Sequence, residues 1–372
     1  MPQVDASVLV PVLNEERYIR DTVRAMQGQR FDGEVEFLFM DGRSEDRTRA
    51  ILEELALEDP RIRVFDNPGR TSTCGLNVGL REARGDFIVR MDAHTFYPED
   101  YIARGVERLR RGDVVWVAGP QVPYGTGRWS RRVALALNSW LGTGGSARWG
   151  SGEEPERELD TGVFAGMWHR ATVESHGGWD DEWAINQDSE LAARILASGG
   201  RIVSLPSLAA RYVPRDSLKG LARQYFRYGT YRAKTAGRHP DSLERRQLVP
   251  LVLLVTLLGS VALPRPLRAL ARLGLLAYVS ALVANAVRSA ADLRARPAGT
   301  APPPDGAEPS PRDAATLPLI FAIMHVTWGA GFVSGSIRFG PPVEALLRAT
   351  GLRSAPAAGS APPSPGSAAP PA

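Results

Sequence analysis

Three aspartates stand where a carboxylate can act on a phosphate or a hydroxyl. Asp41 follows the apolar run Val35–Met40, and beside Gly42 it can accept hydrogen bonds from a base or ribose. Asp92 follows the apolar run Phe87–Met91, where a carboxylate suits a hard divalent ion that bridges two phosphates. Asp188 opens a predicted helix, so we expect it to stay ionised and exposed, as a general base for a hydroxyl must. Plain turn, loop or helix-end roles are the alternatives.

Two further groups add to this chemistry. His94 lies two residues after Asp92, and its imidazole is a better ligand for Mn²⁺ than for Mg²⁺, so the cofactor expected is Mn²⁺ or Mg²⁺. Gln224 and Arg227 are three apart and share a helix face, with Tyr228 next in sequence. An arginine fork fits a diphosphate leaving group, although an ordinary amphipathic surface helix has the same pattern.

The elements that must position these residues alternate between strand and helix. Short apolar runs rich in β-branched residues, such as Ser7–Val12, are followed by helical patterns, the first capped by Asn14. This order predicts an α/β fold with a mostly parallel, doubly wound sheet. Ligands of such sheets bind at the carboxyl ends of the strands, where Asp41 and Asp92 both fall.

In this order the motifs resemble those of glycosyltransferase family 2, whose fold is GT-A, over about residues 5–235. Asp92-Ala93-His94 is similar to the family's DxD metal motif, Asp188 to its ED base, and Gln224, Arg227 and Tyr228 to its QxxRW motif. Within the family the likeness is strongest to the succinoglycan-assembly glucosyltransferases, which share the Asp-Ala-His and Asn-Gln-Asp triplets and carboxy-terminal membrane segments. The resemblance implies these donor nucleotide contacts: Pro11, Asn14, Glu15, Asp41, Asn77 and Asp92.

The resemblance also implies a reaction. A nucleotide diphosphate sugar, expected to be a UDP-sugar, would lose its sugar in one inverting displacement with Asp188 as the base. The expected acceptor is a lipid-linked saccharide of exopolysaccharide or cell-surface glycan synthesis, and the expected sugar is glucose. A polyprenyl-phosphate sugar synthase, a processive polysaccharide synthase and a non-catalytic membrane scaffold remain alternatives. Three tryptophans are candidate stacking surfaces for the acceptor, with core packing as the alternative: Trp168, Trp179 and Trp183.

Composition divides the chain of 372 residues into a charged part and an apolar part. The net charge of +4 is too small to indicate nucleic acid, but a basic stretch, Arg211–Arg246, precedes the first long apolar run, which favours a cytoplasmic membrane face. The single cysteine, Cys74, suits a reducing compartment, and no signal peptide is evident. We therefore expect a cytoplasmic-membrane protein whose catalytic domain faces the cytoplasm.

Apolar stretches set the expected domain boundaries. Leu248–Leu263 and Leu273–Val287 are short for spans and meet at Pro264-Arg265-Pro266, whereas Leu317–Ile337 is long enough to span. The expected order is a GT-A domain at 1–246, a membrane hairpin of two short apolar helices at 247–288, a flexible linker at 289–316, a transmembrane helix at 317–338 and a disordered Pro/Ala-rich tail at 339–372.

Overall fold

An eight-stranded, mostly parallel sheet forms the first part of the protein. The computed structural model describes residues 3–93, 95–146, 148–150, 152, 155–160, 165–295 and 309–353. The strand order is β3-β2-β1-β4-β9-β6-β10-β8, in which β9 and β8 run antiparallel to their neighbours. The strands are β1 (Ala6–Val12), β2 (Val35–Asp41), β3 (Ile62–Asp66), β4 (Phe87–Arg90), β6 (Trp116–Ala118), β8 (Arg157–Leu159), β9 (Gly166–His169) and β10 (Ile202–Ser204). The α/β prediction from the alternating pattern is confirmed.

Helices cover both faces of this sheet, which is why its central strands are continuously apolar. Side chains of α1 (Ile19–Gln27), α2 (Thr48–Glu58) and α4 (Tyr101–Arg110) share one core with one face of the sheet. On the opposite face, α3 (Ser72–Glu82), α7 (Arg170–Ser175) and α8 (Gln187–Ala197) form a second core. A smaller sheet, ordered β5-β11-β7, contains β5 (Thr95–Phe96), β7 (Gln121–Pro123) and β11 (Ala210–Tyr212).

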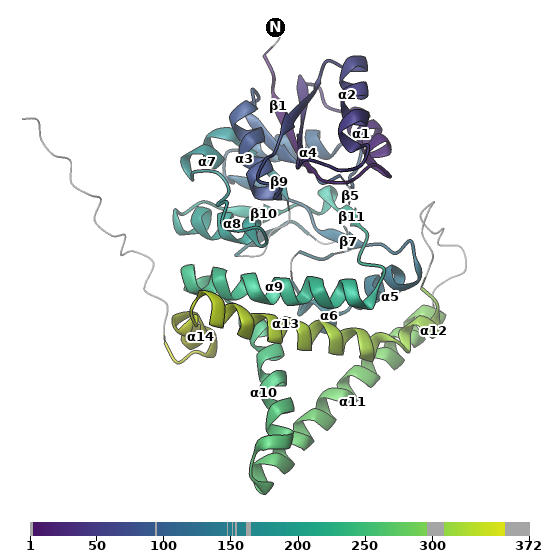
Figure 1. Ribbon diagram of the computed structural model, residues 1–372, viewed down its shortest axis with the longest axis vertical. Coiled ribbons are helices and arrows are strands. Elements are labelled where there is room, and N and C mark those ends of the chain that lie inside the picture. Colours follow the sequence, from purple (N-terminus) through teal and green to yellow (C-terminus); the bar gives the residue numbers. More distant parts are fainter. Residues whose placement is uncertain are drawn as a thin grey trace, which may run out of the picture.

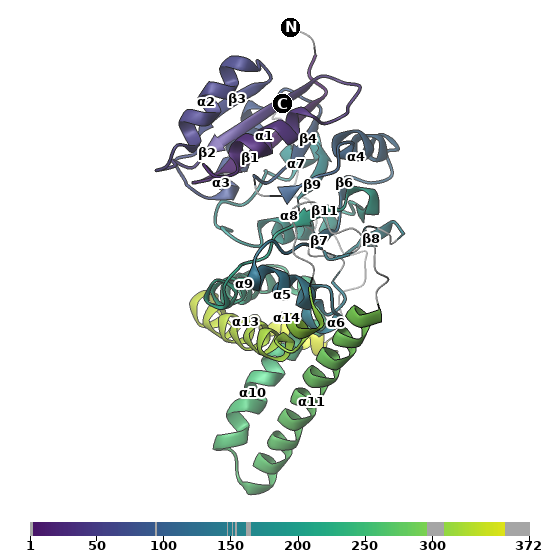
Figure 2. The ribbon, with the colours of Figure 1, turned by 90° about the vertical axis from the view of Figure 1, so that its right-hand side faces the viewer.

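A layer of helices lies below the sheet domain, with a helical hairpin projecting from it (Figure 1). The layer contains α5 (Arg128–Leu137), α6 (Trp140–Thr143), α9 (Leu218–Arg238), α12 (Pro311–Ala314), α13 (Leu317–Phe339) and α14 (Val343–Thr350). The hairpin consists of α10 (Val249–Ala262) and α11 (Arg265–Ala295), and Figure 2 shows both helices pointing away from the domain. By length and composition, Arg245–Ala262, Arg265–Ala295 and Leu317–Phe339 are each sufficient to cross a membrane.

The hairpin exposes large apolar side chains along both of its helices. Val255 and Val261 on α10 are 69% and 75% exposed, and Leu276 on α11 is 62% exposed. The break at Pro264 is as predicted, but the second helix is not short: α11 begins at Arg265, before the predicted Leu273, and does not end at residue 287. It continues through Ala295, because residues 288–295 are helix-compatible and lack glycine and proline.

Helix α13 packs along α9 rather than projecting with the hairpin (Figure 1). Glycines make this contact close: a Cβ at Gly229 of α9 would lie 2.0 Å from the carbonyl oxygen of Trp328, and a Cβ at Gly331 would lie 2.0 Å from that of Phe226. Apolar composition predicted this segment as a transmembrane helix, and the structure accounts for part of its apolar surface by burial against α9.

Both ends of α13 are tied to the rest of the protein by ion pairs. Before it, Asp313 of α12 accepts hydrogen bonds from Arg131 and Arg132 of α5, at 3.1 and 2.7 Å from their Nε atoms. Although burial opposes it, these bonds hold the pKa of Asp313 below its usual range. After it, Arg348 of α14 lies 2.6 Å from Asp241.

Two predicted boundaries therefore differ from the structure. Residues 343–350, expected in the disordered tail, form α14, whose Ala345 and Ala349 are buried. In the segment expected to be a linker, residues 289–295 belong to helix α11. Residues 309–316 contain α12, which is held in place because Asp313 pairs with two arginines. Residues 296–308 and 354–372 lie outside the described residues.

Candidate active site

The first loop after β1 is pinned to the loop after β2, around Asp41. Asp41 is buried at the end of β2, and both of its carboxylate oxygens lie 3.3 Å from the backbone N of Ser44. Asn14 adopts a φ of 57° and accepts a hydrogen bond from the backbone N of Glu45 at 2.8 Å. The backbone N of Glu15 donates to Thr48. Pro11, at the end of β1, pairs in register with Met40. Of the residues predicted to bind the donor nucleotide, Pro11, Asn14, Glu15 and Asp41 thus lie together at the carboxyl ends of β1 and β2.

A buried arginine joins the other two aspartates. Arg90, the last residue of β4, donates from Nε to Asp92 at 3.0 Å and from Nη1 to Asp188 at 2.6 Å. The backbone N of Asp92 also donates to the hydroxyl of Tyr97 at 2.9 Å. The predicted metal-binding carboxylate and the predicted base, 96 residues apart in sequence, therefore share one guanidinium group. Sequence reasoning missed Arg90, although a charged residue inside an otherwise apolar strand was its signal.

Asp188 is not exposed as we expected. It is 9% exposed at the start of α8, because the preceding Asn186 turns the chain inward with a φ of 62°. Burial raises the pKa of Asp188, the charge of Asp92 raises it further, and the charges of Arg90 and Arg148 oppose the shift. A carboxylate with a raised pKa holds an abstracted proton more firmly than an exposed one does, which suits a base.

The predicted metal site is described only in part. Asp92 lies at the mouth of the sheet, whereas His94 lies outside the described residues. Among the residues that the structure describes, no group of three or more metal-binding side chains occurs.

The predicted diphosphate-binding motif is divided between two environments on α9. The side-chain amide of Gln224 donates to the hydroxyls of Tyr228, at 2.9 Å, and Tyr212, at 3.1 Å. Tyr228 is four residues from Gln224 and therefore lies on the same helix face. Arg227 is exposed and lines neither of the cavities described below.

The remaining predicted contacts have structural partners. Asn77 on α3 bonds through its side chain to the backbone of Trp179 and to Asp181, so it fixes the loop that follows α7. Trp168 and Trp179 are buried in the second core, with ring centroids 5.6 Å apart. Trp183 is also buried, and its indole donates to Thr235 at 2.9 Å. Core packing, the alternative interpretation, accounts for all three tryptophans.

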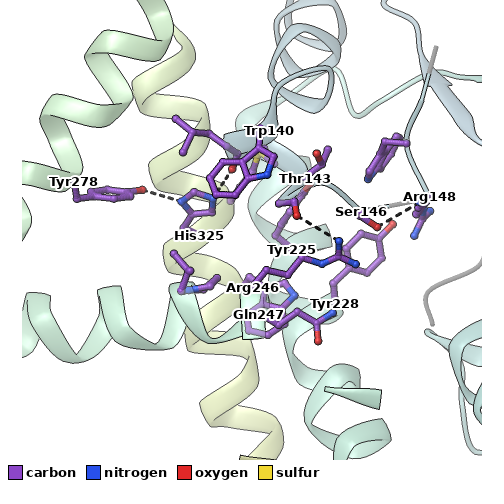
Figure 3. Close-up of a pocket in the computed structure, with 18 residues that line it drawn as sticks. Trp140, Thr143, Ser146, Arg148, Tyr225, Tyr228, Arg246, Gln247, Tyr278 and His325 are labelled. Carbon is purple, nitrogen blue, oxygen red and sulfur yellow. Dashed lines mark hydrogen bonds between the residues drawn. The ribbon is translucent and has the colours of Figure 1, made fainter. Parts of the chain in front are cut away.

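Two adjoining cavities lie around α9, one within the helical layer and the other where that layer meets α8. One has a volume of about 280 Å³ and is bounded by α6, α9, α10, α11 and α13. Figure 3 shows Tyr278 and His325 at one end of it and Tyr228 and Arg148 at the other, with Arg246 between them. The second, of about 130 Å³, reaches Ser189, the residue after Asp188 on α8, and Asn186, the residue just before that helix. Residues common to both linings are Ser146, Arg148, Tyr228, Gln247 and Trp328.

Comparison with known proteins places this site in context. Residues 7–167 match the model of the family "Glycosyl transferase family 2". The chain is 34% identical over 263 residues to the succinoglycan biosynthesis protein ExoA of Rhizobium meliloti (strain 1021), covering 68% of this chain and 77% of that protein. It is 26% identical over 235 residues to the dolichyl N-acetyl-alpha-D-glucosaminyl phosphate 3-beta-D-2,3-diacetamido-2,3-dideoxy-beta-D-glucuronosyltransferase of Methanococcus voltae, covering 60% of this chain and 71% of that protein.

Solved structures are also similar. One of them is the mannosyltransferase PcManGT from Pyrobaculum calidifontis in complex with GDP-Man and Mn²⁺, at 20% identity and a TM-score of 0.46, over 94% of this chain and 89% of that one. The sheet with its carboxylates at the strand ends, the family match and the 34% identity agree, and the chain belongs to glycosyltransferase family 2.

Proposed function

We propose that this protein is an inverting glycosyltransferase that moves a sugar, glucose in our expectation, from a nucleotide diphosphate sugar to a hydroxyl of a lipid-linked saccharide. The observation that carries the proposal is the bridge from Asp92 through Arg90 to Asp188, beside a cavity that continues to the apolar hairpin. The donor would lie on the Asp92 side and the acceptor on the Asp188 side, so the two reactants would meet at Arg90.

The donor half of the site consists of the segments that follow β1 and β2 around Asp41, which hydrogen bonds join to each other. Asp41 is a buried carboxylate at the end of β2, where it can accept hydrogen bonds from the ribose or base of a UDP-sugar. Hydrogen bonds join Asn14 to Glu45 and Glu15 to Thr48. They fix the shape of this binding surface before the donor arrives, which lowers the entropy lost on binding.

Catalysis would rest on Asp188 and Arg90. Arg90 engages Oδ1 of Asp188, which leaves Oδ2 to accept the proton of the acceptor hydroxyl. The hydroxyl oxygen attacks the anomeric carbon as the bond to the diphosphate breaks, and the nucleoside diphosphate leaves. A single displacement inverts the configuration, so an α-linked donor gives a β-linked product. Because Arg90 also binds Asp92, it fixes the base relative to the donor side.

A divalent ion, Mn²⁺ or Mg²⁺, fits the oxygen of Asp92 and the nitrogen of His94, and when bound it would offset the charge on the departing diphosphate. Of these two ligands, the described residues include Asp92, whose carboxylate accepts a hydrogen bond from Arg90.

The proposed acceptor is linked to a lipid, so its binding site must lie close to the membrane. The relative from Methanococcus voltae carries in its name a sugar linked to dolichyl phosphate, and the relative from Rhizobium meliloti is named for succinoglycan biosynthesis. In this chain the α10–α11 hairpin exposes apolar side chains that a bilayer would cover. We place the hairpin in the cytoplasmic membrane, with the catalytic domain on the cytoplasmic face. There α9 and α13 would lie along the surface, because ion pairs hold both ends of α13 to the catalytic domain.

A donor screen tests the proposal. Purified full-length protein, membranes that contain lipid-linked saccharides, and Mg²⁺ or Mn²⁺ are combined with each nucleotide sugar in turn, and the released nucleoside diphosphate and the labelled lipid product are measured. We expect a UDP-sugar to give both signals and the new linkage to be β. Label on lipid phosphate itself would favour a polyprenyl-phosphate sugar synthase, a polymer would favour a processive synthase, and no turnover with any donor would contradict the proposal.

A further inference from the structure

An unusual concentration of positive charge lies in the two cavities. Three guanidinium groups line them, those of Arg148, Arg232 and Arg246, and the only carboxylate among their described lining residues is that of Glu244. Arg246 pairs with Glu244, at 2.5 Å from Nη2. Arg148 is held by Gln121, whose side-chain oxygen lies 2.7 Å from Nε. Among the described lining residues, one carboxylate thus accompanies three guanidinium groups, and Arg148 also lies close enough to Asp188 for its charge to lower the pKa of that carboxyl.

Arg232 is the least compensated of the three. It is 7% exposed, and its hydrogen bond within the described structure, to the carbonyl oxygen of Ser242, is long at 3.4 Å. Burial lowers the pKa of Arg232 to about 10, Glu244 opposes this, and the charges of Arg246 and Arg148 add to it. A guanidinium buried with so little compensation is costly, and an anion between the three groups would remove much of that cost.

The same space has an apolar end. Val249 of α10, Tyr278 of α11 and Met324 of α13 line the larger cavity alone, and Trp328 of α13 lines both cavities. A ligand that fills both cavities must therefore carry negative charge at one end and an apolar chain at the other. The donor carboxylates Asp41 and Asp92 line neither cavity, so this anion site is distinct from the donor half of the active site.

We propose that these cavities bind an isoprenoid lipid phosphate, with its phosphate between Arg148, Arg232 and Arg246 and its first isoprene units against Tyr278, Met324 and Trp328. Guanidinium forks match phosphate oxygens well, and aromatic and thioether side chains adapt to a branched chain. The saccharide attached to the phosphate would extend past Asn186 and Ser189 toward Asp188. This assignment rests on the proposed transfer to a lipid-linked acceptor, and it adds where the carrier is held.

Binding of farnesyl phosphate to the full-length protein in nanodiscs tests the site directly. We expect farnesyl phosphate to bind at least about tenfold more tightly than farnesol, which lacks the charge, and than inorganic phosphate, which lacks the chain. Arg246→Gln should weaken it by about tenfold or more, whereas the exposed α9 variant Arg223→Gln should bind within about twofold of the unaltered protein. Arg232→Lys, which keeps the positive charge but loses the planar guanidinium fork, should also weaken binding.

Three results would overturn the site: equal affinity for farnesol and farnesyl phosphate, unchanged affinity in Arg246→Gln, or displacement of farnesyl phosphate by UDP, which would assign the arginines to the donor. Failure of the proposed function looks different. If no nucleotide sugar is turned over, yet farnesyl phosphate binding depends on Arg246, the lipid phosphate site stands and the transferase proposal falls. If transfer occurs but farnesyl phosphate binds independently of the arginines, the transferase stands and this site falls.

Discussion

The Nη1 atom of Arg90 lies 2.6 Å from Oδ1 of Asp188, while Nε of the same guanidinium lies 3.0 Å from Oδ1 of Asp92. The guanidinium group of Arg90, at the end of β4, thus lies between two carboxylates. One follows shortly after β4 and the other lies at the start of α8. Because Arg90 and Asp188 are buried and Asp92 is partly buried, each charge strongly affects the others.

Replacing Asp188 with Asn should remove proton acceptance and keep the shape of the side chain. We expect turnover to fall by about 10²- to 10⁴-fold, the range for a general base, with donor affinity preserved. Steady-state transfer and equilibrium binding of the nucleotide sugar measure the two effects, and Asp21→Asn, an exposed helix position, is the control. Retained turnover in Asp188→Asn would exclude it as the base.

Replacing Arg90 with Gln should change the pH dependence of turnover. Arg90 lowers the pKa of Asp188 against burial and the charge of Asp92, so its loss raises that pKa further. Since the base works only when deprotonated, the acidic limb of the pH–rate profile should move to higher pH. A profile that keeps its acidic limb while losing amplitude would instead point to a purely structural role for Arg90.

Activity should require a divalent ion, with Mn²⁺ at least matching Mg²⁺, because the nitrogen of His94 favours manganese. Titration with a chelator, followed by restoration with each ion, measures the requirement. His94→Asp should shift the preference toward Mg²⁺. Full activity in excess chelator would refute the requirement, and an unchanged preference in the variant would remove His94 as a ligand.

The contact between α9 and α13 should not tolerate a side chain at Gly331. An added Cβ would lie 2.0 Å from a backbone oxygen that cannot rotate away, so Gly331→Ala should lower the free energy of unfolding by about 1–3 kcal/mol or more. Gly237→Ala on α9 is the matched control. Nothing lies within 4 Å of its Cβ, and it should stabilise by roughly 0.5–1 kcal/mol. Thermal unfolding in detergent compares the two, and equal stability would mean that the helices are not in backbone contact.

Tags at the two ends of the chain should be accessible from the same side of the membrane. In the proposed placement, the α10–α11 hairpin would return the chain to the side from which it enters, and ion pairs hold both ends of α13 to the catalytic domain. Labelling of the tags in intact and in permeabilised cells measures this. A carboxy-terminal tag on the opposite side would mean that α13 crosses the bilayer.

The site's carboxylates could be predicted because strand ends are visible in sequence and parallel strands bring their ends together. The burial of Asp188 could not, since it depends on the turn at Asn186 and on Arg90, which is distant in sequence. The arginines of the cavities were visible only as part of a basic stretch, and nothing local separates Arg232, which is buried, from Arg227, which is exposed.

Two glycines in the sequence indicate that α13 packs closely against another helix, but the apolar composition of the segment makes this indication easy to overlook. Apolar residues fit a bilayer and a protein surface equally well, so length and hydropathy favour a span. Gly331 and Gly335, four residues apart, mark a face made for close helix contact, but such faces occur within membranes too. The ion pairs of Asp313 and Arg348, whose partners are distant in sequence, are what favour the surface arrangement that we propose.

The packing of α13 also sets the order in which the protein becomes competent during synthesis. Met324 and Trp328 complete the larger cavity, yet they emerge from the ribosome after the sheet domain and after the hairpin. Since domains generally fold from the amino terminus as they are made, the sheet can form first, but the wall of the cavity arrives only once the hairpin is available for insertion. A chain that stops near Arg246 would keep the carboxylates and lose that wall, so in the proposed arrangement insertion of the hairpin and completion of the acceptor cavity would occur together.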